Sequence, residues 1–310
     1  MHKFILRRLL AVIPILIGIT LVTFIILNVI PGSPLALMMD PKAGDLDPYA
    51  AQLIKAKWGL DQPLHVQYLR FLKNAIHGDL GYSYRFNQDV TKIVLQRLPA
   101  TGKLAVAALT VSVTVGILAG VLSAVKHQTW IDSAAMAVAL IGVSMPVFWS
   151  GLMLMYVFAV KLRWLPPSGY GDGAFRYLLM PAITLGFSMA GVIARLTRSS
   201  MLNVIRMEYV TTARSKGVSE RGVIYRHAFR NAMIPVVTLV GVQTGALLSG
   251  AVVTETVFSW PGVGRLLIDS IMFRDLPVVQ GSVILIALIF LTVNLAVDIL
   301  YAYLDPRIRY

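Results

Sequence analysis

The segment 195–231 carries the side chains whose types and spacing say most about chemistry. It holds eight basic and two acidic residues, a formal charge of +6. Apolar residues recur at helical spacing through its first half, Gly217 follows them, and Ser219 comes two residues later. Glycine adopts the left-handed conformation that ends a helix at little cost, and serine is a favoured N-cap for the next helix. The pattern therefore predicts a bent helix–glycine–helix.

The bounds of these two helices follow from the same pattern. Apolar positions predict one helix that continues from the preceding apolar run up to Gly217, and a second short helix over Glu220–Arg230. Such an amphipathic projection can lie in a groove of a soluble partner protein. It can equally lie as a basic loop on anionic lipid. Charge alone does not choose between the two. The apolar positions are Met201, Val204, Ile205, Tyr209 and Ala213.

Residue patterns for covalent chemistry or for ATP binding are missing from the sequence. There is no cysteine, which excludes a disulfide framework, a thiol nucleophile and a Cys-ligated metal. The five histidines are scattered without an H-E-x-x-H pair, and no G-x-S-x-G stretch occurs. Gly102-Lys103 is followed by leucine and lacks the upstream glycine of a phosphate-binding loop. We therefore predict that the chain is not an enzyme, binds no metal or cofactor itself, and leaves ATP to another protein.

The elements that must position the 195–231 segment are membrane-spanning helices. Hydrophobic residues make up 57% of the 310 residues and charged residues 14%, against about 25% charged in a soluble domain. Six stretches contain no Asp, Glu, Lys or Arg, and about 20 such residues in a helix cross the hydrocarbon core. The sequence predicts an all-α polytopic membrane protein with six transmembrane helices, forming a single domain over 1–310. The six stretches are Leu9–Ile30, Leu104–Val125, Ser133–Val160, Tyr177–Ala194, Ala232–Thr254 and Leu276–Val297.

The distribution of Lys and Arg predicts the orientation of these spans. The first apolar stretch is too long for a cleaved signal peptide and lacks a small-x-small site, so we expect a retained span. With the N-terminus inside, the inner segments hold 14 Lys and Arg and the short outer loops 161–176 and 255–275 hold five. Basic residues favour the cytoplasmic side. Both termini and 195–231 are thus expected in the cytoplasm, and the formal charge of +13 needs no nucleic acid to explain it.

The long outer segment 31–103 is predicted to contain helices of its own. Capping signals predict helices over 48–58 and 63–77, and a third over 89–98 that Pro99 would end. This segment can be a cap on the membrane domain, a docking surface or a gate. A short apolar helix over Arg265–Phe273 is expected in the outer loop 255–275, either lining a vestibule or acting as a lid. Within the second span, Gly116-x-x-x-Gly120 predicts close helix packing.

The stretch Tyr209-Val-Thr-Thr-Ala-Arg-Ser-Lys-Gly217 resembles the "EAA" cytoplasmic loop of ABC importer permeases. It is most similar to the form found in the peptide/nickel subfamily of these permeases. Further stretches of the same subfamily extend the resemblance over essentially the whole chain. They include Arg195-x-x-Arg198, 227–238, Pro261-Gly-Val-Gly264 and the end at 304–310.

This resemblance implies a type I ABC importer permease fold and a pore-forming role in the bacterial cytoplasmic (inner) membrane. The implied partners are a second homologous permease subunit, two ATPase subunits that hold ATP and Mg²⁺, an extracytoplasmic solute-binding protein, and membrane lipid. The implied substrates are di- and oligopeptides, with nickel chelates or glutathione as alternatives. The residues expected to couple this chain to an ATPase subunit are Glu208, Tyr209, Ala213, Gly217, Ser219 and Glu220.

A secondary transporter is the remaining alternative among transport proteins. Such proteins usually place ionisable residues near the middle of the membrane, whereas Glu255 and Asp298 fall at the ends of charge-free stretches here. The sequence names no substrate-binding residue. A few polar side chains within the spans can either face a pore or hydrogen-bond between helices. They are Ser144, Gln243, Ser249, Thr292 and Asn294.

Overall fold

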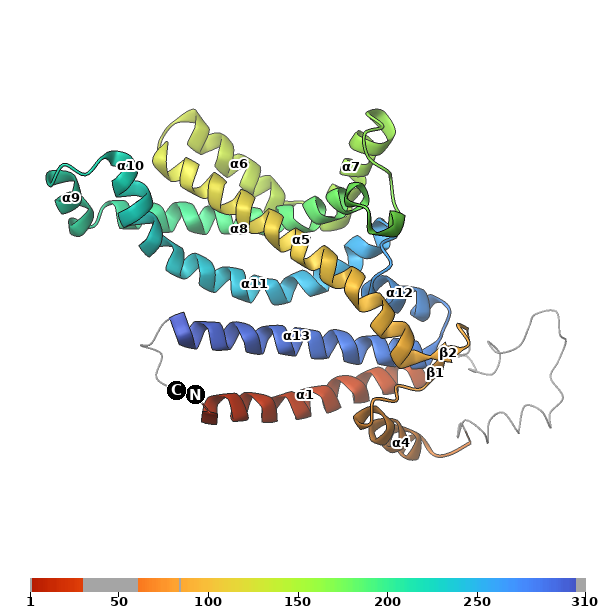
Figure 1. The fold of residues 1–310 in the computed structure, drawn as a ribbon. Helices are drawn as coiled ribbons and strands as arrows, with labels where there is room; N and C mark the ends of the chain where they lie inside the picture. The colour runs from red at the N-terminus through yellow and green to blue at the C-terminus, as the bar shows by residue number, and fades with distance from the viewer. Residues whose placement is uncertain (1, 30–60, 84, 305–310) are drawn as a thin grey trace. The chain divides into compact units, whose positions relative to one another are not determined.

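A computed structural model of the chain describes residues 2–29, 61–83 and 85–304, and nearly all of them are helical (Figure 1). A small antiparallel hairpin is the exception: β1 (Tyr82–Ser83) pairs with β2 (Gln88–Asp89), with Tyr82 opposite Asp89. Two-residue strands are too short to show apolar alternation, so no sequence pattern indicated this hairpin.

The described residues of the six charge-free stretches lie on helices, as expected for a polytopic membrane protein, apart from one break in the third stretch. Among the described residues, α1, α5, α8 and α13 are each long and apolar enough to cross a membrane, and a bent pair of helices is a fifth candidate. The fifth stretch lies within α11. The bounds are α1 (His2–Val29), α5 (Val90–Val125), α8 (Phe175–Ile205), α11 (Phe229–Val257) and α13 (Leu276–Leu304).

The bent pair occupies the stretch that we expected to form one span. Helix α6 (Trp130–Ser144) and α7 (Val147–Met155), which continues into the π-helix η1 (Tyr156–Lys161), meet at 109°. Met145 between them is extended, with ψ of 133°, and Pro146 follows. A residue before proline is pushed out of the helical region because the proline ring clashes with it. The dipeptide therefore interrupts the helix.

The structure confirms one of the predicted outer helices and changes another. Helix α4 (Leu64–Ile76) lies where 63–77 was expected, and Gly78 after it has a φ of +81°. The expected helix 48–58 lies outside the described residues. The separate helix over 89–98 was wrong, because α5 runs without interruption through Pro99. Membrane helices tolerate an internal proline when neighbouring groups compensate for the lost hydrogen bond.

The chain divides into two compact units. The first comprises Met1–Ala100 and Pro261–Leu291. It contains α12 (Val263–Met272), which confirms the short helix expected in the outer loop. Its apolar core joins the start of α5 to α12 and α13, and Ser83 Oγ donates to the Asp275 carboxylate. The buried core residues are Val90, Ile93, Val94, Val263, Leu266 and Val278.

The second unit comprises Thr101–Trp260 and Thr292–Tyr310. It contains α8, which packs closely against α5, α6 and α11 (Figure 1), and the short 3-10 helix η2 (Gly171–Gly173). A Cβ placed on Gly120 would lie 2.5 Å from Thr197 Cβ and 2.6 Å from the Ala194 carbonyl oxygen of α8. A Cβ on Gly116 would be similarly close to Ile193. The glycine pair thus allows two helix backbones to approach, as predicted from its spacing.

Candidate functional site

The segment between α8 and α11 folds as a compact projection, but its first helix is not continuous. Helix α8 ends at Ile205, Met207 is extended with ψ of 148°, and α9 (Glu208–Ser215) then begins. Our expectation of one helix up to Gly217 was therefore wrong. The break turns Val210 and Ala213 of α9 back onto α5 and α8, where both are buried. Burial of these two apolar side chains favours this arrangement.

Gly217 forms the sharp bend that the sequence predicted. Its φ is +80°, its N–H donates to the Arg214 carbonyl at 2.9 Å, and the Val218 N–H donates to the Ala213 carbonyl at 3.3 Å. This is the left-handed ending of a helix in which glycine is favoured. None of the described atoms lies within 4 Å of a Cβ placed on Gly217, so only its backbone conformation requires glycine.

Ser219 caps the next helix, as expected, and its Oγ accepts a hydrogen bond from the Gly222 N–H at 3.4 Å. The predicted short helix over 220–230 was wrong in its extent. Helix α10 (Glu220–Gly222) passes into the π-helix η3 (Val223–Ala228) and then directly into α11. The capped turn is therefore the beginning of a long helix. The widened η3 turn presents Val223, Ile224 and Ala228 to the interior.

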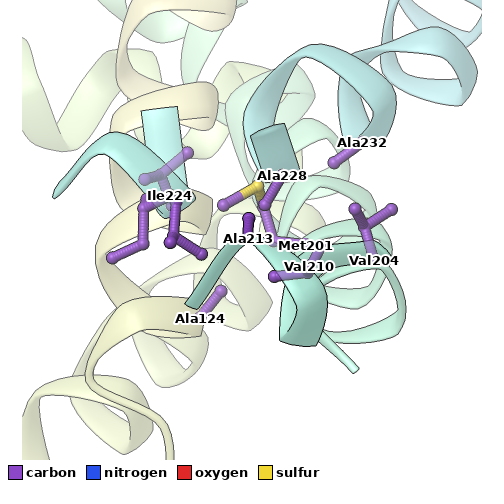
Figure 2. Packing of buried hydrophobic residues seen from close by; sticks show 10 residues of the cluster. Ala124, Met201, Val204, Val210, Ala213, Ile224, Ala228 and Ala232 are labelled. Atoms are coloured by element: carbon purple, nitrogen blue, oxygen red, sulfur yellow. The ribbon is translucent and has the colours of Figure 1, made fainter. Parts of the chain in front are cut away.

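An apolar cluster packs the projection against α5, α8 and α11, and we call this cluster the loop core (Figure 2). Every helix that enters or leaves the projection contributes to it, as do two residues near the end of α5. Because these side chains are buried together, α9 is fixed on α5, α8 and α11. The loop core consists of Val121, Ala124, Met201, Val204, Val210, Ala213, Val223, Ile224, Ala228 and Ala232.

The loop core separates the six residues singled out from the sequence into two kinds. Ala213 is buried in it and faces the protein interior. The other five are exposed to solvent: Glu208, Tyr209, Gly217, Ser219 and Glu220.

Two contacts that the sequence analysis did not identify fix the projection from outside the loop core. Across the bend, Arg214 Nη2 donates to Glu220 Oε1 at 2.8 Å and Nε donates to Oε2 at 3.1 Å. The guanidinium lowers the pKa of the Glu220 carboxyl below its ordinary value. In the sequence, the only indication of this ion pair was two opposite charges six residues apart around a predicted turn. Both side chains are more than a third exposed, so we expect the pair to contribute less than about 1 kcal/mol.

The second contact joins α9 to the start of α11. Asn231 Nδ2 donates to the Tyr209 hydroxyl oxygen at 2.7 Å, and that hydroxyl donates to the His227 carbonyl at 3.3 Å. The three residues come from separate turns of the projection that only the fold brings together.

The polar residues considered for a substrate path are less informative. Ser144 on α6, Gln243 on α11, and Thr292 and Asn294 on α13 are all partly or fully exposed. The side chain of Ser249 lies outside the described residues. Within the described part of the chain, no group of three or more His, Asp or Glu residues is arranged to hold a metal ion.

Two known protein families together match nearly the whole chain. Residues 116–310 match the family described as "Binding-protein-dependent transport system inner membrane component". Residues 1–105 match the N-terminal region described for membrane components of the same transport systems.

Full-length relatives are named for the transport of short peptides. The chain is 42% identical to a dipeptide transport system permease protein of Alkalihalophilus pseudofirmus, over the full length of both. It is 45% identical to a di/tripeptide transport system permease protein of Pseudomonas aeruginosa, covering all of this chain and 99% of the relative. A glutathione transport system permease protein of Escherichia coli K12 is 41% identical over both full lengths.

Two solved structures share the fold at low sequence identity. One is an amino acid ABC transporter with histidines, at a TM-score of 0.53 and 18% identity, covering 70% of this chain and 95% of that chain. The other is a methionine ABC transporter in inward-facing conformations, at a TM-score of 0.54 and 15% identity, covering 69% and 96%. The helical arrangement is thus that of ABC importer membrane subunits.

Proposed function

The chain belongs to the family of binding-protein-dependent transport system inner membrane components, and from this premise we propose that it forms the pore of an ATP-driven importer for di- and oligopeptides. As a family member it is a polytopic permease subunit of the bacterial inner membrane and not a catalytic subunit. The single observation that carries the peptide assignment is end-to-end similarity, at 41–45% identity, to permeases named for dipeptides, di/tripeptides and glutathione.

Glutathione is a second candidate substrate because relatives of equal coverage are named for it. It is itself a small peptide with charged ends, so both candidates share one chemistry. Nickel chelates, suggested by the wider subfamily, differ in size and charge. We propose that an extracytoplasmic binding protein selects the substrate and delivers it to the pore.

The assembly that we propose contains this chain, a second homologous permease subunit and two ATPase subunits, which hold ATP and Mg²⁺. Both termini and the projection at 195–231 lie in the cytoplasm, in agreement with the excess of Lys and Arg on that side. The 31–103 segment lies outside, where the binding protein arrives.

Coupling to ATP hydrolysis is assigned to the projection. We propose that Glu208, Tyr209, Gly217, Ser219 and Glu220 dock in a cleft of one ATPase subunit, while Ala213 holds α9 against the loop core. Two observations support this assignment: the bend is fixed on its apolar side, and its polar side is exposed. Binding of ATP can change the pore only if the docked contacts differ between the inward- and outward-facing states.

Reconstitution tests the proposed substrate class. The importer is assembled with its binding protein in proteoliposomes, and uptake of radiolabelled dialanine, glutathione and a nickel–histidine chelate is compared with ATP and without it. We expect ATP-dependent uptake of dialanine or glutathione. Uptake of the nickel chelate alone would contradict the peptide assignment, and uptake without ATPase subunits would contradict the importer assignment.

A further inference from the structure

A buried carboxylate at one end of α6 collects an unusual number of donors. Asp132 lies in the first turn of α6, and only 4% of its surface is exposed. A buried carboxylate is costly unless paired and fully hydrogen-bonded, and this one is both. Its neighbours are Ser123 Oγ at 2.5 Å, Arg198 Nε at 2.7 Å and Nη2 at 2.8 Å, the Gln128 N–H at 3.1 Å and His127 Nδ1 at 3.1 Å.

Most of these neighbours are local and form the turn between α5 and α6. Ser123 lies in the last turn of α5, while His127 and Gln128 lie in the connecting residues 126–129. Gln128 has a φ of +61°, and its N–H is directed at the carboxylate. Asp132 with these three neighbours is sufficient to explain a tight turn.

Arg198 is different, because it comes from α8, 66 residues along the chain. Its guanidinium meets both carboxylate oxygens, the two-pronged geometry that gives arginine pairs their directional strength. Its Nη2 also lies 3.2 Å from His127 Nδ1, so Arg198 contacts two residues of this turn. It joins the α5–α6 turn to α8, seven residues before α8 ends at Ile205.

The same end of α8 also carries part of the loop core. Met201 and Val204 pack there with Val210 and Ala213 of α9. Nearby, Gly120 of α5 allows close approach to Thr197, the residue before Arg198. One short stretch of α8 is therefore attached to α9 by apolar packing and to the α5–α6 turn by an ion pair.

We propose that Asp132 and Arg198 are positioning residues that make α5, α6 and α8 move as one body when the projection is displaced. The inference rests on the proposed coupling role of the projection. Without the ion pair, α8 follows α9 but the α5–α6 turn lags behind it. The importer then hydrolyses ATP with less substrate moved per cycle.

The test is the ratio of substrate imported to ATP hydrolysed, measured in proteoliposomes with the complete importer. The probe is dialanine or glutathione, whichever the wild-type importer transports. Arg198→Gln is expected to lower the ratio by roughly five- to tenfold, at the lower end of the usual coupling between sites, while ATPase subunits still assemble. Two matched controls are expected to keep the wild-type ratio. Arg195→Gln removes an exposed arginine one turn earlier in α8, and Ser123→Ala removes only a local donor.

Two further variants separate positioning from folding. Arg198→Lys keeps the charge but cannot donate to both carboxylate oxygens from a planar guanidinium, and it is expected to give an intermediate ratio. Exchanging the pair, Asp132→Arg with Arg198→Asp, is expected to restore part of the ratio lost in Arg198→Gln. If Arg198→Gln fails to accumulate, the ratio measured for Arg198→Lys serves as the test. A wild-type ratio in Arg198→Gln, or in Arg198→Lys where it replaces Arg198→Gln, would overturn the inference. Absence of peptide transport by the wild-type importer would instead overturn the proposed function.

Discussion

The Tyr209 hydroxyl and the Asn231 side-chain amide lie 2.7 Å apart, which links α9 to the first turn of α11 outside the loop core. Tyr209 belongs to the stretch that resembles the EAA loop, whereas Asn231 lies 22 residues later. The projection is thus held by apolar packing on one side and by a polar contact on the other.

Removing this contact is expected to weaken coupling without affecting membrane insertion. Tyr209→Phe and Asn231→Ala should each destabilise the packing of α9 against α11 by about 0.5–1.5 kcal/mol, the net value of an ordinary hydrogen bond. The double variant should cost little more than either single one, because both remove the same contact. Uptake per ATP hydrolysed measures the effect, and Tyr225→Phe, at a 64% exposed tyrosine, is the control. Strictly additive effects would show that the two residues act separately.

Gly217→Val is expected to misdirect α10 and reduce ATPase association or coupling. A non-glycine residue pays roughly 1–2 kcal/mol in the left-handed region, and no described atom near Gly217 adds a clash. Gly217→Asn should be milder because asparagine tolerates that region. Gly78→Val, at a φ of +81° in the outer segment, should leave ATPase association unchanged. Normal uptake by Gly217→Val with a full complement of ATPase subunits would refute the coupling role. That result is the one expected if the projection is a basic loop lying on lipid, because such a loop would tolerate the substitution.

The Arg214–Glu220 pair should matter less than the bend. Glu220→Arg places like charges across the turn and is expected to reduce coupling less than Gly217→Val does, since exposed pairs contribute about 1 kcal/mol or less. Adding Arg214→Glu should restore the opposite charges across the turn and part of the lost ratio. Because Arg214 lowers the pKa of Glu220 below 4.5, the pair's stabilisation is complete at neutral pH. It is lost only as the pH falls through the lowered pKa. A coupling ratio that changes between pH 6 and 8 because of Glu220 would contradict this.

The α5–α8 crossing should not accept a side chain at its closest point. Gly120→Ala would place its Cβ 2.5 Å from Thr197 Cβ, so the helices must separate, at a cost of about 1–3 kcal/mol. Lower abundance and a lower unfolding temperature in detergent would be the result. Gly102→Ala is the matched control on the same helix, because no described atom lies within 4 Å of a Cβ placed on Gly102. Equal stability of the two variants would disprove close packing at Gly120.

Cysteine labelling tests the proposed orientation, and the chain has no native cysteine to interfere. Ser219→Cys should resist a membrane-impermeant thiol reagent in intact cells and react after the membrane is opened. Gln88→Cys, exposed on β2, should react from outside. Ser83 is unsuitable despite its place in the outer segment, because it is buried and hydrogen-bonded to Asp275. Labelling of both sites from outside would refute the orientation.

Periodicity and capping signals were sufficient to predict much of this fold. Long charge-free stretches predict helices because a membrane allows little else, and Gly217 predicts a left-handed turn because few residues tolerate one. The break at Met207 could not be predicted, since it follows from burial of Val210 and Ala213 against other helices. Likewise, nothing local indicates that Arg198 will meet Asp132, because that pairing depends on how α6 and α8 pack.

The division of the projection into buried and exposed positions has a consequence for how such importers diversify. Its shape depends on Val210, Ala213, Val223 and Ile224, which no docked protein touches. Exposed residues that make no contact within the projection can change without refolding it. Under the proposed coupling role, recognition of one ATPase rather than another can therefore evolve by substitutions on the exposed side alone. After gene duplication, two permeases can acquire separate motors, or share one, while their membrane helices stay the same.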